Sequence, residues 1–156
     1  MNKEVQYFIT TLQNTLYGEP WYGRSVHSIL ETVDPTIVYI KPGETEHSLI
    51  ELLYHMNTWA LFTVKRLEKD IVHDDSYFGP IDWRPIDPVE HTWEKGTALL
   101  TQLHEQIVAL LQTQNDDFLQ EQVDFREYNF RFLLNGLIQH NIYHLGQIAY
   151  VGKFLM

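Results

Sequence analysis

Residues 129–154 have the sequence NFRFLLNGLIQHNIYHLGQIAYVGKF, which contains one continuous stripe of mostly apolar side chains. The stripe recurs in steps of three and four residues, the spacing that places side chains on one face of an α-helix. Its members are Leu133, Leu137, His140, His144, Ile148 and Val151. We therefore predict a helix here, capped by Asn129, whose buried face includes two histidines one turn apart.

Three further segments have apolar residues at helical spacing, and they cover residues 5–16, 44–69 and 89–112. No segment shows the alternation typical of a strand, so the pattern predicts an all-α four-helix bundle formed by one domain, residues 1–156. Residues 71–88 contain several prolines, and we expect a long irregular connection there, followed by Asp87 as the N-cap of the third helix. Such a connection would let the second and third helices run the same way, in up-down-down-up order.

The composition limits the chemistry and the partners. The chain has 156 residues, a formal net charge of −10 and no cysteine. Nucleic acid is therefore a poor candidate partner, because phosphate binding depends on clustered Lys and Arg, and any metal must be held by His, Asp or Glu. No apolar run approaches the ~20 residues of a membrane helix. The first residues lack the apolar core of a signal peptide, so we expect a cytoplasmic protein without a membrane partner.

Three of the eight histidines fall on helix faces that the pattern predicts to be buried. His140 and His144 are four residues apart, a spacing that lets both rings reach one metal ion. His55 lies on the apolar stripe of the second helix and also points toward the core. Three imidazoles on facing helices make a site with an open coordination position, which is typical of catalytic metals. The alternative is that these are core histidines hydrogen-bonded to the backbone or to water.

Other side chains near these histidines are weaker candidates for roles in catalysis. Glu51 lies one turn before His55, where it either accepts a hydrogen bond from a metal ligand or lies exposed at the surface. Tyr143 and Gln147 flank the histidine pair and are candidates to face a cleft, although packing explains Tyr143 better. The catalytic group itself cannot be named from these residues.

The predicted substrate cleft is aromatic and includes Trp21, Tyr22 and Trp59. Arg24 and Arg66 are candidates to make such a cleft cationic, unless both are plain surface charges.

The remaining histidines show no paired ligand. His47 lies off the face of His55 by helical geometry, and we expect it at the surface or at the mouth of the cleft. We expect His104 to be partly buried with its hydrogen bonds satisfied. The others are predicted to be solvated, namely His27, His73 and His91.

Signatures of other chemistries are missing from the chain. It has neither a nucleophile-elbow motif nor a glycine-rich phosphate loop. The Glu-x-x-His motif of di-iron bundles is also absent, since Leu137 and Asn141 stand three residues before His140 and His144.

Three segments resemble the DinB/YfiT-like superfamily. The most specific is 134-LNGLIQHNIYHLGQI-148, which looks like the last helix of that family. The segment 47-HSLIELLYHMNTW-59 resembles its second helix, and 18-GEPWYGRS-25 resembles the part that follows its first helix.

This resemblance implies a four-helix bundle in up-down-down-up order. It also implies a divalent metal, usually zinc or nickel, bound by one histidine of the second helix and two of the last. These positions correspond here to His55, His140 and His144.

Characterised members of the family that this chain resembles include transferases that join a low-molecular-weight thiol, such as bacillithiol or mycothiol, to electrophiles. Others are thiol-dependent isomerases or are described as metal-dependent hydrolases, and many are homodimers. The resemblance leads us to expect a metal-dependent transferase or hydrolase that acts on a small electrophilic molecule. A non-catalytic metal-binding module for stress response is the second hypothesis, and a hydrogen-bonded histidine cluster without metal is the third.

Overall fold

The computed structural model describes residues 2–156, which form helices and loops without a β-strand. The helices are α1 (Lys3–Tyr17), α2 (Val26–Leu30), α3 (Leu49–Leu67), α4 (Asp75–Asp82), α5 (Trp93–Gln112), the short 3-10 helix η1 (Asp116–Gln120) and α6 (Phe130–Leu155). The predicted all-α class is therefore confirmed. Among residues 2–156, no helix combines the length and the apolar character needed to cross a bilayer.

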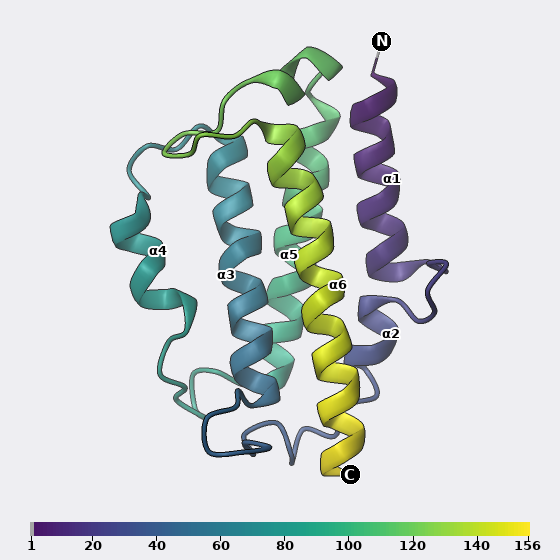
Figure 1. Cartoon of the computed structure of the whole chain (residues 1–156), viewed down its shortest axis with the longest axis vertical. Coiled ribbons are helices and arrows are strands. Elements are labelled where there is room, and N and C mark those ends of the chain that lie inside the picture. Colours follow the sequence, from purple (N-terminus) through teal and green to yellow (C-terminus); the bar gives the residue numbers. More distant parts are fainter. Residues whose placement is uncertain (1) are drawn as a thin grey trace.

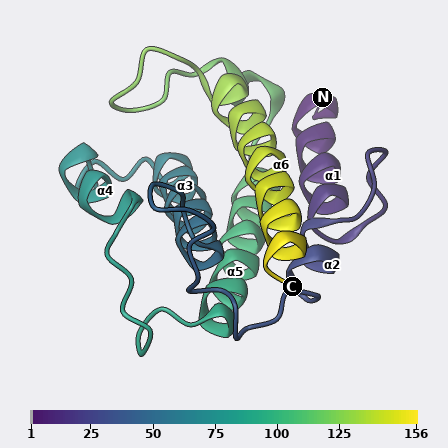
Figure 2. The same ribbon diagram turned by 60° about the horizontal axis from the view of Figure 1, so that its bottom comes forward.

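The long helices α1, α3, α5 and α6 lie side by side around a shared core of buried apolar side chains. In Figure 1, α1 and α6 run downwards and α3 and α5 run upwards. Both α1 and α3 pack against α5 and α6. Figure 2 shows α4 on the outer side of α3, and α2 near the lower ends of α1 and α6. The contact between α3 and α6 is the one that positions the candidate site.

Local capping residues set where the helices begin. Asn129 accepts a hydrogen bond from the third backbone N–H of α6, as predicted from the sequence. Ser48 and Glu51 form a reciprocal capping box, so α3 begins five residues later than predicted. Thr92 caps α5, whereas the predicted cap Asp87 accepts a hydrogen bond from the N–H of Val89 within a separate turn.

The connection predicted to be irregular contains a helix, α4. Asp74 caps it by accepting a hydrogen bond from the N–H of Ser76. Its buried residue Phe78 packs edge-on against Phe62 of α3, with ring centroids 5.2 Å apart. Gly79 and Pro80 disfavour a helix locally, but this aromatic contact with a distant part of the chain stabilises α4.

Candidate metal centre

The structure brings His55, His140 and His144 together between α3 and α6. Each ring offers one ligand atom, and these three atoms all lie within 4.8 Å of one another. The Nε2 atoms of His55 and His140 are 3.0 Å apart. The helical spacing of His140 and His144 and the packing of α3 against α6 together produce this convergence.

In two of the three rings, His55 and His144, Nδ1 donates a hydrogen bond to a neighbouring side chain. Nδ1 of His55 lies 2.5 Å from Oδ1 of Asp82, and Nδ1 of His144 lies 2.6 Å from Oε1 of Gln147. Since a carboxylate or amide oxygen only accepts, both rings carry the proton on Nδ1. Their Nε2 lone pairs are therefore free to point at the centre of the cluster. An acceptor behind a histidine that fixes its tautomer is a common support for metal ligands.

His140 has a nitrogen without a partner. Its buried Nδ1 forms no hydrogen bond, while its Nε2 faces the lone pair of His55. Without an ion, only a proton on Nε2 of His140 relieves the repulsion between these two atoms. A divalent transition ion would satisfy the lone pairs of all three rings together, and neutral imidazole is a usual ligand for such ions. The residues present therefore fit a divalent transition metal.

Electrostatics keep the cluster uncharged at neutral pH. Burial, with smaller contributions from His144 and His47, lowers the pKa of His55 to about 4. Burial and the two neighbouring rings lower the pKa of His140 to about 3. Burial also lowers the pKa of His144, although its hydrogen bond to Gln147 opposes this shift. The neutral form is the one that binds a metal.

An aromatic side chain from the end of α4 covers the face of His55. The Trp83 ring stacks on His55 with centroids 3.8 Å apart and on His47 with centroids 3.7 Å apart. The three rings are nearly parallel, with interplanar angles of 9° and 7°. Asp82 and Trp83 are adjacent in the chain, so one short segment both orients His55 and shields it from water.

A mostly apolar groove of about 210 Å³ opens beside His140. It is lined by Trp59, Thr63, Tyr128, Phe132, Leu133, Gly136, Leu137 and His140. On another side, a hollow of about 400 Å³ is bordered by His47, Gln147 and Tyr143, among others. Small molecules therefore have space next to the cluster on two sides.

The two weak catalytic candidates, Glu51 and Tyr143, lie in different surroundings. Glu51 accepts hydrogen bonds from the backbone and hydroxyl of Ser48, and its other oxygen is 3.4 Å from Nζ of Lys41. Its carboxylate thus holds the start of α3, and its nearest histidine is His47, at 3.9 Å. Tyr143 is exposed, and its ring lies edge-on to His144 with centroids 5.0 Å apart.

The predicted cleft residues are divided between separate places. Trp59 lies near the cluster, with its ring centroid 6.1 Å from that of His140. Trp21 is fully exposed, and Tyr22 and Arg24 line a different cavity, between α2 and α6. Arg66 is fully buried, where it donates hydrogen bonds to the backbone carbonyls of Asp70 and His73.

Sequence reasoning missed Asp82 and Trp83. Both lie in the segment predicted to be irregular, 27 and 28 positions after His55, and no spacing rule links them to it. The pair "Asp-Trp" at the end of a short helix gives no local signal. His47 was predicted at the surface or the cleft mouth, and the structure places it there, stacked on Trp83.

Comparison with known protein families gives one finding. The family model of the DinB superfamily matches residues 23–148, a span that includes all three cluster histidines. A search of curated proteins found no match to the chain, and a search of solved structures also found none. Because the family match covers well over half of the sequence, this chain belongs to the DinB superfamily.

Proposed function

We propose that this protein is a divalent-metal-dependent enzyme, a thiol transferase or hydrolase acting on a small electrophilic substrate. His55, His140 and His144 would hold the ion, with zinc or nickel as the expected metals. The observation that carries the proposal is the pair of fixed tautomers, since Asp82 and Gln147 leave the Nε2 lone pairs of His55 and His144 available in a cluster whose ligand atoms lie within 4.8 Å of one another. Membership of the DinB superfamily supports the same assignment.

A catalytic role is favoured over a structural one by the number of ligands. Among residues 2–156, the cluster contains three metal-binding side chains, whereas structural zinc sites usually contain four. When bound, the ion would supply Lewis acidity that lowers the pKa of a thiol or water.

The protein's own side chains supply the remaining functions. Asp82 orients His55, and Trp83 keeps water from one face of that ring. Trp59 and the groove beside His140 would bind the apolar body of the electrophile. Low-molecular-weight thiols are the proposed co-substrates of a transferase.

Two further features belong to this proposal. We read the long helices as a four-helix bundle in up-down-down-up order, which the directions of α1, α3, α5 and α6 in Figure 1 support. We also propose a homodimer, as in many relatives of the family that the sequence resembles.

The first experiment is metal content of the tag-free protein by mass spectrometry, beside the variant His140→Ala/His144→Ala. We expect a near-stoichiometric divalent ion that the variant lacks. The matched control is His27→Ala/His91→Ala, which also removes two histidines but leaves the cluster intact and should retain the ion. Metal in none of the three proteins, even after reconstitution, would overturn the proposal and favour a hydrogen-bonded histidine cluster.

Activity is tested next, by following the loss of a small thiol in the presence of an electrophile such as a chlorinated aromatic compound. Turnover that disappears in His140→Ala/His144→Ala supports the transferase, and product formation without thiol consumption supports the hydrolase. A tightly held ion that exchanges no ligand and supports neither reaction would identify a non-catalytic metal-binding module instead.

A further inference from the structure

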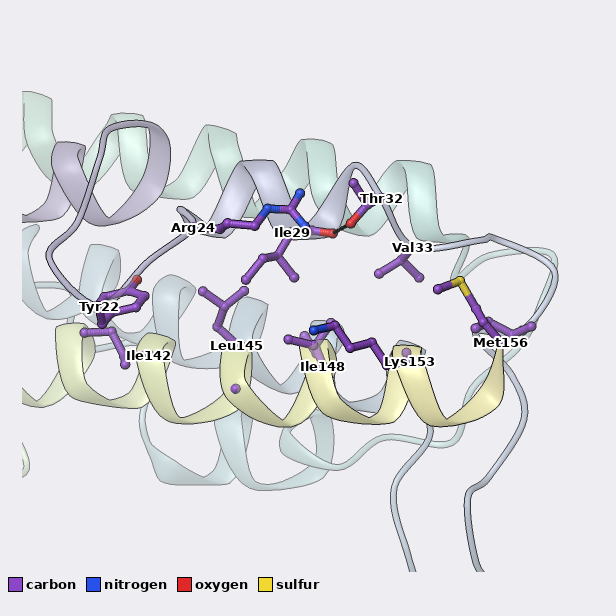
Figure 3. Close-up of a pocket in the computed structure, with 14 residues that line it drawn as sticks. Tyr22, Arg24, Ile29, Thr32, Val33, Ile142, Leu145, Ile148, Lys153 and Met156 are labelled. Atoms are coloured by element: carbon purple, nitrogen blue, oxygen red, sulfur yellow. Dashed lines mark hydrogen bonds between the residues drawn. The ribbon is translucent and has the colours of Figure 1, made fainter.

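The cavity that Tyr22 and Arg24 line has a volume of about 510 Å³ and lies between α6 and the segment containing α2 (Figure 3). The α6 residues that line it include Leu145, Ala149 and Gly152, which by helical geometry lie on the side of α6 opposite His140 and His144. None of the three cluster histidines lines it. Its volume is within the range of small-molecule sites, which is about 300–1,000 Å³.

Small residues on α6 create the hollow. A Cβ atom added at Gly146 or at Gly152 would meet no other atom within 4 Å, so the packing of α6 does not require glycine at either position. Glycine inside a helix costs about 1 kcal/mol relative to alanine, so these residues leave open space at the expense of helix stability. Across the cavity, the wall is apolar and includes Ile29, Val33 and Ile37.

Two cations line the cavity from opposite sides. Figure 3 shows Arg24 on the side of α2 and the amine of Lys153 folded back along α6 toward Ile148. Arg24 is held in place by hydrogen bonds from its Nε to Oγ of Ser28, at 3.0 Å, and from its Nη2 to the carbonyl of Ser28, which leaves Nη1 for a ligand. Within residues 2–156, neither cation forms an ion pair with a carboxylate. Two cations without a carboxylate partner at one apolar cavity would complement the charge of an anionic ligand.

We propose that this cavity binds a small amphipathic carboxylate, with its hydrocarbon chain against α6 and its carboxylate between Arg24 and Lys153. Burial of the chain against apolar side chains favours binding in proportion to the area removed from water. The guanidinium and ammonium groups donate charge-assisted hydrogen bonds that a carboxylate accepts. This site does not depend on the metal centre, so failure of the metal proposal would leave it standing.

The test is calorimetric titration of the full chain with octanoate, with 1-octanol as a neutral probe of the same length. We expect one octanoate per chain, in chelator-treated protein as well. Lys153→Gln and Arg24→Gln should each weaken octanoate binding by about two- to fivefold, as expected for partly exposed ion pairs, without affecting octanol. The control Lys3→Gln removes a lysine on α1 and should change neither affinity.

Gly152→Leu tests the cavity itself. Leucine favours a helix more than glycine does and would occupy the open space, so α6 should remain folded with an unchanged or higher Tm. We expect this variant to lose both octanoate and octanol binding. Undiminished octanoate binding by Gly152→Leu, or no saturable binding by the unaltered protein up to about 10 mM, would overturn the proposal. The proposal would also be overturned if the unaltered protein bound no octanoate and formed a dimer that Gly152→Leu converts to a monomer. The cavity would then be a contact surface for a second copy of the chain.

Discussion

His104 lies between α5 and α6, and the cluster of His55, His140 and His144 lies between α3 and α6, but the ring nitrogens of the two histidine sites have different partners. Nδ1 of His104 donates to the carbonyl of Leu100 at 2.8 Å, and its Nε2 accepts from Nδ2 of Asn141 at 2.8 Å. One neutral tautomer satisfies both nitrogens of His104. In the cluster, by contrast, three nitrogens converge on one another and one ring nitrogen remains unpaired. Ring nitrogens that converge on one another therefore distinguish the cluster, as a candidate metal site, from the satisfied His104.

The largest expected effect is loss of stability at the satisfied histidine. His104→Ala leaves a cavity and removes the acceptor from the amide of Asn141, which should lower the free energy of unfolding by about 2–4 kcal/mol. Urea denaturation measures this value. Metal content per folded chain should stay at the level of the unaltered protein. Loss of the ion in this variant would show that the two histidine sites are not independent.

Metal binding should stabilise the unaltered protein against unfolding, but not a variant that lacks one of the three histidines. At a free ion concentration of 100 times its Kd, the ion should raise the free energy of unfolding by about 2.7 kcal/mol. His55→Ala should abolish this gain, because only two of the three converging rings remain. Thermal melts with zinc, with nickel and with chelator measure the shift. Equal melting temperatures of the unaltered protein in all three would contradict a metal site.

Removing the acceptors behind the ligands should have graded effects. Asp82→Ala should weaken metal affinity by about 10–100-fold, because His55 loses the carboxylate that fixes its tautomer. Gln147→Ala should weaken it less, by about three- to tenfold, since a hydrogen bond to a neutral amide is weaker than one to a carboxylate. Competition with a chromogenic chelator gives both values. A larger loss of affinity in Gln147→Ala than in Asp82→Ala would contradict this order, and would mean that Gln147 on α6 is the more important support.

Lowering the pH should reduce the stability of the protein through the protonation of His104. Burial lowers the pKa of His104 to about 4 from its ordinary 6.5, so the folded state holds it neutral while the unfolded state takes up a proton. Its contribution to stability is complete above about pH 6.5 and is lost as the pH falls toward 4, by at most ~1.4 kcal/mol per pH unit. Denaturation of metal-free protein at pH 7, 6 and 5 should show a smaller loss for His104→Gln than for the unaltered chain. Identical losses would assign the acid sensitivity to other groups.

The elements predicted well from sequence are those whose evidence is local. Apolar residues at helical spacing identified α1, α3, α5 and α6, and Asn129 marked the start of α6 correctly. The helix α4 was missed because Gly79 and Pro80 disfavour it locally, while the packing of Phe78 on Phe62 is a contact between distant parts of the chain. The starts of α3 and α5 were predicted too early, since Ser48 and Thr92 are the caps that the folded chain uses.

The sequence by itself determined the helical class, the family resemblance and the buried faces on which His55, His140 and His144 lie, because each of these rests on residue type and on spacing along a helix. The tertiary structure alone decided how those histidines are supported. Only the docking of α4 on α3 places Asp82 and Trp83 against His55, and only the packing of α3 on α6 aligns the Nε2 atoms of His55 and His140. Helical periodicity indicates which face of a helix is buried, but which side chains that face contacts depends on how the helices pack in three dimensions.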